Sequence, residues 1–196
     1  RERLAAGSNG FRGVFGGGKT NSSSNVIDYI TIATTGNATD FGDIITATES
    51  MAGAGGTSRA IFAGGYTTGQ INVIQYITIA TTGNATDFGD LLSAKHKIAA
   101  LSNDTRCLFG GSSSSTNVIQ YITTATTGNA TDFGDLSAAK QSMAATSNST
   151  RGVFAGGYTT SRQNVIEYVT IATTGNTTDF GDLTEAKMSF SATSGT

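Results

Sequence analysis

One stretch of sequence occurs four times in this chain with few changes, and this repetition limits the possible folds more than any other feature. Close copies of NVIQYITIATTGNATDFGDL begin at Asn25, Asn72, Asn117 and Asn164, so successive copies lie 45 to 47 residues apart. Self-similarity at a period of roughly 20 to 50 residues is typical of solenoids, propellers and other repeat arrays. The 196 residues therefore predict a row of small modules instead of one or two ordinary domains.

The repeated modules have the residue types of β-strands joined by turns. Val, Ile, Thr, Tyr and Phe occur in short runs between Gly, Asn and Ser clusters, and the chain has 26 Gly and no Pro or Trp. In the first repeat these runs predict strands at 3–8, 11–16, 25–34 and 40–45, recurring at the same offsets. The period of helical repeats is absent, and β-helix coils are shorter. The sequence thus predicts an all-β protein with four antiparallel strands per repeat.

The first strand of each repeat joins small residues to one large apolar residue. The small pairs are Ala5-Ala6, Ala52-Gly53, Ala99-Ala100, Ala144-Ala145 and Ser191-Ala192. The large residues just before them are Leu4, Met51, Ile98, Met143 and Phe190. Small side chains fit where the innermost strands of several blades converge, and the large residue is expected to pack between neighbouring blades. This pattern favours a β-propeller of four-stranded blades.

The order of features within one repeat resembles the kelch repeat of β-propellers. A small-residue strand, a hairpin turn and a hydrophobic strand lead to a diglycine, and a loop and a Tyr-containing strand follow; the diglycines are Gly17-Gly18, Gly64-Gly65, Gly110-Gly111 and Gly156-Gly157. The chain departs from kelch repeats because the Trp after the Tyr is missing and the aromatic lies later, at Phe41, Phe88, Phe133 and Phe180. The sequence motif TTGNATDFGDL also resembles repeats in structural and tail-associated proteins of marine bacteriophages.

Repeat boundaries follow from the starts of the first strands. They predict blades at 1–47, 48–94, 95–139 and 140–186, with 187–196 as the first strand of a further blade. A self-contained ring of four blades has no place for that extra strand. We therefore expect a section of a larger propeller, completed by further blades of a longer chain or by a second copy in a homo-oligomer. The chain opens on Arg1, already inside a repeat, which also predicts a segment of something longer or a processed product.

Differences between the copies indicate where a partner binds. Antiparallel blades place the turns SN-x-T-R and TTGNATD, which hardly vary, on one side, and the variable loops KTNSSS, YTTGQI, SSSST and YTTSRQ on the other. Loops on a rigid framework are where binding usually resides. The candidate ligand-binding residues on the variable side are Tyr66, Lys95, His96, Lys97, Tyr158 and Arg162. The basic run at Lys95 would attract an anionic group such as a glycan, or it is an ordinary solvated loop.

The constant side carries a repeated arginine and repeated aspartates, to which we assign structural roles. The arginines are Arg12, Arg59, Arg106 and Arg151, and the first aspartates of the TDFGD motifs are Asp40, Asp87, Asp132 and Asp179. Each guanidinium is expected to bridge to a carboxylate of its own or an adjacent blade. Calcium binding by the aspartate pairs is the alternative, but one motif supplies too few ligands, so no metal is predicted.

Composition argues against several classes of partner and activity. A formal net charge of −2 and 13% charged residues give no basic footprint for nucleic acid or an anionic membrane. No apolar run reaches the roughly 18 residues of a membrane span. Cys107 is the chain's one cysteine, so no internal disulfide forms, and we expect it to be buried and inert. His96 is the one histidine, and a metal site or catalytic triad resting on it lacks support.

These features together predict a non-enzymatic structural and binding module without a cofactor. The similarity to phage repeats implies a virion or extracellular location, in a phage tail or fibre that recognises a host-surface glycan or another virion subunit. An intracellular kelch-type adaptor that binds another protein through the same face is the first alternative. A propeller enzyme resembling galactose oxidase is the second, and the single histidine argues against it.

Overall fold

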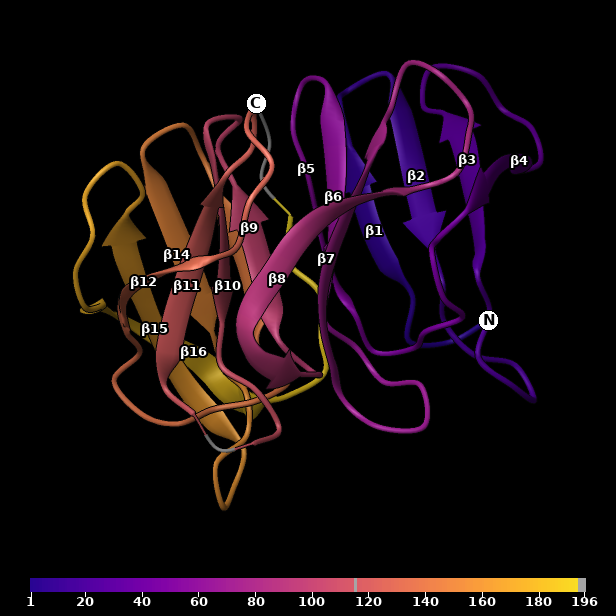
Figure 1. Cartoon of the computed structure of the whole chain (residues 1–196). Helices are drawn as coiled ribbons and strands as arrows, with labels where there is room; N and C mark the ends of the chain where they lie inside the picture. Colours follow the sequence, from indigo (N-terminus) through magenta and orange to yellow (C-terminus); the bar gives the residue numbers. More distant parts are fainter. Residues whose placement is uncertain (115, 194–196) are drawn as a thin grey trace. The chain divides into compact units, whose positions relative to one another are not determined.

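The chain folds entirely into β-strands. The computed structural model describes residues 1–114 and 116–193, and within these residues there are sixteen strands and no helix. The strands form four sheets of four antiparallel strands, and each sheet uses four consecutive strands of the chain (Figure 1). The all-β prediction is confirmed. Within the described part, no helix is present that could cross a membrane.

Each sheet is built from one repeat. The first contains β1 (Ala5–Ser8), β2 (Arg12–Gly16), β3 (Val26–Thr31) and β4 (Thr39–Asp43). The second contains β5 (Ala52–Gly55), β6 (Arg59–Ala63), β7 (Ile71–Thr78) and β8 (Thr86–Lys95). The third contains β9 (Ala99–Ser102), β10 (Arg106–Gly110), β11 (Val118–Thr123) and β12 (Thr131–Asp135). The fourth contains β13 (Ala144–Ser147), β14 (Arg151–Ala155), β15 (Gln163–Thr170) and β16 (Thr178–Lys187).

Two predicted boundaries differ from the structure. The third strand of the first repeat ends at Thr31, not at 34, because the N–H of Thr34 donates to the carbonyl of Thr31 (3.2 Å) and closes a turn. The strand expected at 187–196 does not form: Lys187 ends β16, residues 188–193 are not in a strand, and 194–196 lie outside the described residues. Its pairing partner would be the second strand of a further repeat, which this sequence does not contain.

The chain divides into two compact units of two sheets each. The first unit is Arg1–His96 together with Thr127–Asn129, and the second is Lys97–Thr126 together with Ala130–Thr196. Ser115, in the third variable loop, lies outside the described residues. Sheets one and two thus belong to the first unit, and sheets three and four to the second.

A hydrophobic core lies in each unit. In the first unit it includes Ala5, Val14, Ile27, Phe41, Ile44, Met51, Ala60, Phe62, Ile77 and Ile79. In the second it includes Ala99, Leu101, Leu108, Ile119, Phe133, Leu136, Met143, Phe154, Val169 and Ile171. The same repeat positions recur in both lists, so the repeated sequence encodes the same packing in each unit.

Small residues in the first strands allow those strands to approach closely. A Cβ added to Gly53 on β5 would lie 2.5 Å from the carbonyl oxygen of Ala6 on β1, closer than a side chain can stand. In the second unit the hydroxyl of Ser147 on β13 donates to the carbonyl of Ser102 on β9 (2.6 Å). Convergence of neighbouring first strands, expected from their small residues, is therefore present within each unit.

Repeated turns and bulges fix how each sheet is shaped. In three repeats an Asn side chain closes the hairpin between the first two strands, as where Asn9 Oδ1 accepts the N–H of Arg12 at 2.8 Å. Between the third and fourth strands a β-bulge leaves Phe41 without a directly paired residue. Phe41 is buried, with its ring edge-on to Tyr29 at 5.7 Å. The bulge therefore turns the aromatic of TDFGD into the core.

One unexpected feature recurs just before each large apolar residue of the first strands. Five residues there have left-handed backbone with φ between 55° and 57°, and they are Arg3, Ser50, Lys97, Ser142 and Ser189. Non-glycine residues adopt this conformation uncommonly. Backbone hydrogen bonds link them within each unit: Ser50 N–H donates to Arg3 (3.1 Å), and Ser142 N–H donates to Lys97 (3.0 Å). These bonds hold the left-handed residues in place.

Candidate functional site

Two of the residues predicted to bind a ligand meet at the loop end of the first unit. Tyr66 and Glu49 exchange backbone hydrogen bonds of 2.8 and 3.0 Å, which anchor the loop after β6 to the loop after β4. The rings of Tyr66 and His96 lie with centroids 5.4 Å apart and planes tilted by 54°. Tyr66 remains 37% exposed. An accessible aromatic pair on an anchored loop can stack against a flat apolar group of a ligand.

A buried carboxylate, missed in the sequence, organises the basic groups of the same loops. Glu49 is only 5% exposed, yet it accepts a hydrogen bond from Arg3 Nη1 at 3.0 Å and one from Lys19 Nζ at 3.3 Å. Arg3 and Lys19 are themselves partly exposed. The comparison of repeats carried a signal, because the position of Glu49 holds His96 and Gln141 in the next two copies. We call Arg3, Lys19, Glu49, Tyr66 and His96 the loop cluster.

Lys95 does not lie on the surface where the sequence placed it. It ends β8 and is 3% exposed, so it is no candidate for contact with a ligand. Sequence reasoning placed Lys95 on a solvent-facing loop, whereas it is the last residue of a strand and is buried. Lys97 is exposed and has the left-handed backbone described above, and it belongs to the second unit.

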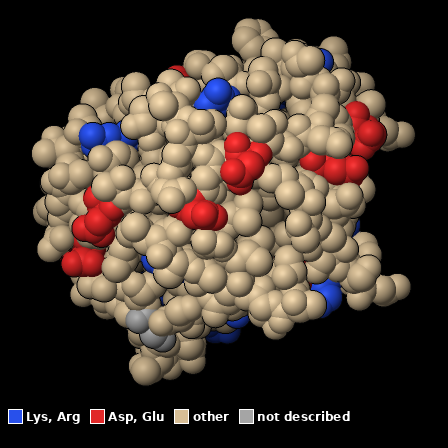
Figure 2. All heavy atoms as spheres, viewed as in Figure 1, with Lys and Arg blue, Asp and Glu red and all other residues tan. Residues whose placement is uncertain are grey.

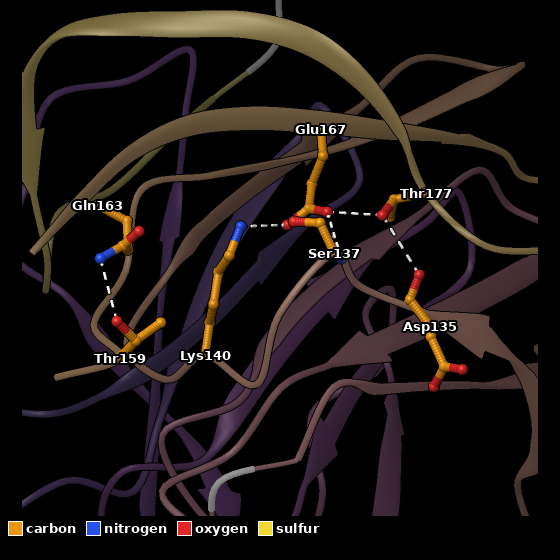
Figure 3. Close-up of polar contacts among 7 residues, drawn as sticks. All are labelled: Asp135, Ser137, Lys140, Thr159, Gln163, Glu167 and Thr177. Atoms are coloured by element: carbon orange, nitrogen blue, oxygen red, sulfur yellow. Dashed lines mark hydrogen bonds and ion pairs between the residues drawn. The ribbon is translucent and has the colours of Figure 1, made fainter.

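The remaining two candidates meet through their backbones in the second unit. Tyr158 forms isolated β-bridges with Gln141 and with Arg162, and its N–H donates to the Gln141 carbonyl at 2.9 Å. Arg162 is exposed and Tyr158 is half-buried. The tip of this loop is braced by Gln163, whose amide donates to the hydroxyl of Thr159 at 3.1 Å (Figure 3). Tyr158 therefore occupies in the fourth repeat the place of Tyr66 in the second.

On the opposite side, each repeated arginine covers an aromatic pair. The guanidinium of Arg12 lies 4.6 Å from the centroid of the Tyr29 ring, whose own edge contacts Phe41. The other three sets are Arg59 with Tyr76 and Phe88, Arg106 with Tyr121 and Phe133, and Arg151 with Tyr168 and Phe180. Cation–π contacts of this kind contribute about 0.5–1 kcal/mol at exposed sites.

The acceptors of these guanidinium groups differ from the predicted carboxylates. Arg12 Nη1 donates to the carbonyls of Ile79 (2.9 Å) and Ala80 (3.0 Å) in the neighbouring sheet. Arg106 Nη1 donates to Ile171 and Ala172 at the same two distances. The predicted bridge to Asp was therefore wrong for these two arginines. Backbone carbonyls at the end of a strand are acceptors that no pattern of side chains reveals.

We expect Arg106→Lys to lower the free energy of unfolding by about 1–2 kcal/mol, because lysine keeps the charge but loses the planar group that stacks and donates twice. Chemical denaturation of the purified chain measures the change. Arg151→Lys is the matched control, since Arg151 lies over Tyr168 at 4.5 Å but, among the described residues, makes no carbonyl hydrogen bond. Equal losses in the two variants would contradict the assigned role of the carbonyls.

The aspartates predicted to be structural are exposed at the starts of the fourth strands, and they are Asp40, Asp87, Asp132 and Asp179. Their second partners in TDFGD act through the backbone, as where the N–H of Asp43 donates to Asn84 Oδ1 at 3.0 Å. Across residues 1–114 and 116–193, no three His, Cys, Asp or Glu side chains come together as metal ligands.

A buried ion pair in the second unit is the strongest polar cluster of the described chain. Lys140 Nζ and Glu167 Oε1 are 2.5 Å apart, and their side chains are 2% and 1% exposed (Figure 3). The other carboxylate oxygen, Oε2, accepts the N–H of Ser137 at 2.8 Å and the hydroxyl of Thr177 at 2.6 Å. Both oxygens of Glu167 thus have donors.

Hydrogen bonding keeps this carboxylate charged. Burial by itself would raise the pKa of Glu167, but the hydrogen bonds from Lys140, Thr177 and Ser137, with the charge of Lys140, outweigh it and hold that pKa below the ordinary 4.5. An enclosed, fully bonded carboxylate of this kind is suited to hold two sheets together. Cys107 is also fully buried, and burial raises the pKa of its thiol far above the usual value, as expected for an inert cysteine.

Equivalent positions in other repeats carry matched chemistry, a signal that sequence reasoning missed. Arg1 pairs with Asp28 in the first repeat, at the positions of Lys140 and Glu167. In the second repeat these positions are Thr48 and Gln75, both buried. Gln75 Oε1 accepts the N–H of Ile45 at 2.8 Å, just as Glu167 accepts that of Ser137. A cation therefore accompanies an acid in the first and fourth repeats, and Thr accompanies an amide in the second. The third repeat differs, because it has the cation Lys95 and the amide Gln120 at these positions, both buried.

Surface charge is dispersed on the face shown in Figure 2. Lysine and arginine side chains there lie apart from one another, separated by uncharged surface. Comparison with known proteins adds no family: no protein-family model matches the chain, and no curated protein matches it.

Proposed function

We propose that this chain is a section of a kelch-like β-propeller that binds an anionic or polar glycan through the loop cluster of its first unit and the equivalent loop of its second. The observation that carries the proposal is the accessible Tyr66–His96 pair, flanked by two cations that Glu49 orients. Aromatic rings stack on the apolar faces of sugars, and nearby cations attract acidic substituents.

The biological setting that we propose is a phage tail or fibre, in which the protein binds a glycan of the host surface without catalysis. The setting rests on the resemblance of TTGNATDFGDL to phage repeats that the sequence suggests. One observation supports a binding role: variation between the copies concentrates in the loops that carry Tyr66 and Tyr158. Glu167, a carboxylate whose pKa is clearly lowered, lies enclosed in an ion pair with Lys140.

A binding assay with the purified chain tests the proposal. The probes are sialylated and sulfated oligosaccharides with their neutral analogues, and the variant combines Tyr66→Ala with Tyr158→Ala. We expect at least about a tenfold loss of affinity in the double variant, as for buried aromatic anchors, and weaker binding at high salt. The control combines Thr39→Ala with Thr86→Ala, two exposed residues at the other end of the sheets. Absence of binding to any probe, or equal loss in both variants, would overturn the proposal.

A further inference from the structure

Neighbouring sheets within a unit interlock through one turn and one strand. The turn after β7 lies on β4, where the N–H of Gly83 donates to the carbonyl of Phe41 (2.8 Å) and the N–H of Ala85 donates to that of Asp43 (2.8 Å). Asn84 Oδ1 accepts the N–H of Asp43 at 3.0 Å. Three polar contacts therefore place TTGNAT of one repeat against DFGD of the repeat before it.

The same interlock occurs twice more. In the second unit Gly175 N–H donates to Phe133 (2.7 Å), and Asn176 Oδ1 accepts the N–H of Asp135 at 3.0 Å. In the first unit the segment Thr127–Asn129 lies on β8 in the same way, and the N–H of Gly128 donates to the carbonyl of Phe88 at 2.8 Å. The carbonyl of the turn glycine Gly175 lies so close to Gly134 of the covered strand that a Cβ added to Gly134 would be 2.2 Å from Gly175 O.

In the fourth sheet the equivalent strand, β16, has no turn of another repeat packed on it among the described residues. Phe180 is 55% exposed, whereas its equivalents Phe41, Phe88 and Phe133 are each 2% exposed. Space for a Cβ at Gly181 is open to 4 Å. Arg151 covers Tyr168, yet within the described chain it has no carbonyls to which it can donate as Arg12 and Arg106 do. The outer face of the fourth sheet, around β16, is therefore built to receive a turn.

The first sheet presents the complementary surface. Ile32 is 52% exposed, although the equivalent Ile79 and Ile171 are fully buried against the preceding sheet. Phe15 is half-buried, while its equivalents Phe62, Phe109 and Phe154 are fully buried. The two apolar residues that are buried at the junctions elsewhere are thus present and uncovered on this sheet.

We propose that two copies of this chain associate head to tail, with the first sheet of one copy on the fourth sheet of the other. Gly36 N–H of the second copy then donates to Phe180 O, and Asn37 Oδ1 accepts the N–H of Asp182. Arg151 donates to the carbonyls of Ile32 and Ala33, completing the contacts that Arg106 makes within its own unit. The proposal rests on junctions inside the units and is independent of the glycan proposal. A heterologous contact of this kind builds either closed rings or open chains.

One segment competes with the incoming copy. In the repeat pattern, Arg1–Ala5 of that copy and Lys187–Ser191 of the receiving chain occupy the same place. The carboxyl-terminal segment must leave for the second copy to enter. A chain that ends at Lys187 lacks most of the competing segment and is therefore expected to associate more tightly than the 196-residue chain, by about tenfold for each 1.4 kcal/mol of displaced contacts.

Sedimentation velocity over a range of concentrations tests the proposal. We expect concentration-dependent association of the 196-residue chain that Ile32→Asp weakens at least tenfold. The matched control is Ile45→Asp: Ile45 is 51% exposed, and its equivalent Leu92 is 53% exposed in a sheet whose fourth strand is already covered. Circular dichroism and thermal melting confirm that each variant is folded.

Mixing two blocked variants gives a sharper result. Ile32→Asp leaves the fourth-sheet face intact, and Phe180→Asp leaves the first-sheet face intact, so neither associates alone but a one-to-one mixture forms a heterodimer. Three outcomes would overturn the proposal: a monomer at every concentration for both the full chain and the chain ending at Lys187, equal effects of Ile32→Asp and Ile45→Asp, or no heterodimer in the mixture.

Discussion

Lys140→Met is expected to lower the free energy of unfolding by about 3–5 kcal/mol, because it leaves the carboxylate of Glu167 buried without its cation. The pair is enclosed, with side chains 2% and 1% exposed, so water cannot replace the lost ammonium group. Lys187→Met is the matched control at the same position of the next repeat, where the side chain is 49% exposed and pairs with the exposed Glu185 at 3.5 Å. Its expected effect is within about 0.5 kcal/mol. Urea denaturation followed by circular dichroism measures both.

A double variant separates loss of charge balance from loss of packing. Lys140→Thr with Glu167→Gln copies Thr48 and Gln75 of the second repeat, where a neutral pair of positions is already buried. We expect this double variant to be more stable than Lys140→Met, since the amide can still accept the N–H of Ser137 without an uncompensated charge. If the double variant were no better than the single one, unbalanced charge would not be the cause of the loss.

The same pair sets a dependence on pH. The folded-state pKa of Glu167 is lowered below 4.5, so its contribution to stability is fully present above that ordinary value and is lost as pH falls through the lower, folded-state pKa. The difference in unfolding free energy between the native chain and the Thr–Gln double variant should therefore shrink on the acidic side of that range. A difference that grows toward acid would contradict the assignment.

Gly134→Ala is expected to destabilise the chain by about 1–3 kcal/mol more than Gly181→Ala, because its methyl group would meet the Gly175 carbonyl at 2.2 Å. The two glycines occupy the same repeat position and have similar backbone, with φ of 148° and 134°. Both alanines carry the cost of that conformation, about 1–2 kcal/mol by analogy with left-handed residues. Only Gly134 has a turn against it, since nothing lies within 4 Å of a Cβ at Gly181.

Thermal and urea denaturation of the two glycine variants, each as a dilute monomer, gives this difference. Gly181→Ala should also weaken head-to-tail association, since it would place a methyl group where the glycine of the incoming turn lies. Equal destabilisation of the monomers would mean that backbone conformation alone determines the loss of stability. It would also mean that the turn at Gly175 moves away from the added methyl group without a measurable loss.

Strand order and residue packing were readable from the sequence because they follow local patterns. The β-branched runs, the Asn turns and the small residues of the first strands each have one physical reason, and each recurs in three or more repeats. The third strand of the first repeat was predicted too long because Thr31 and Thr34 suit a strand as well as the turn that they form. Composition alone does not separate these two uses of threonine.

The candidate site was harder to predict because its chemistry depends on burial. Lys95 was predicted to contact a ligand, yet it is 3% exposed, and neither Lys140 nor Glu49, which are 2% and 5% exposed, was singled out. A lysine next to a loop gives no local sign that a carboxylate lies beneath it. The usable sign was at long range: the two repeats with an acid on the third strand, Asp28 and Glu167, both begin with a cation, Arg1 and Lys140.

This paired variation has a consequence for recombination of the repeats. The first member of each pair begins a repeat and the second lies on the third strand of that same repeat, as with Lys140 and Glu167. A cassette cut from Lys140 to Ala186 carries a cation together with its acid, and it can be duplicated or transplanted without stranding either charge. A cassette cut at Asn164 would separate Glu167 from Lys140. Glu167 would then face whichever residue begins the repeat in the neighbouring segment. For the first and fourth repeats, crossovers just before the cation therefore keep each charge with its partner.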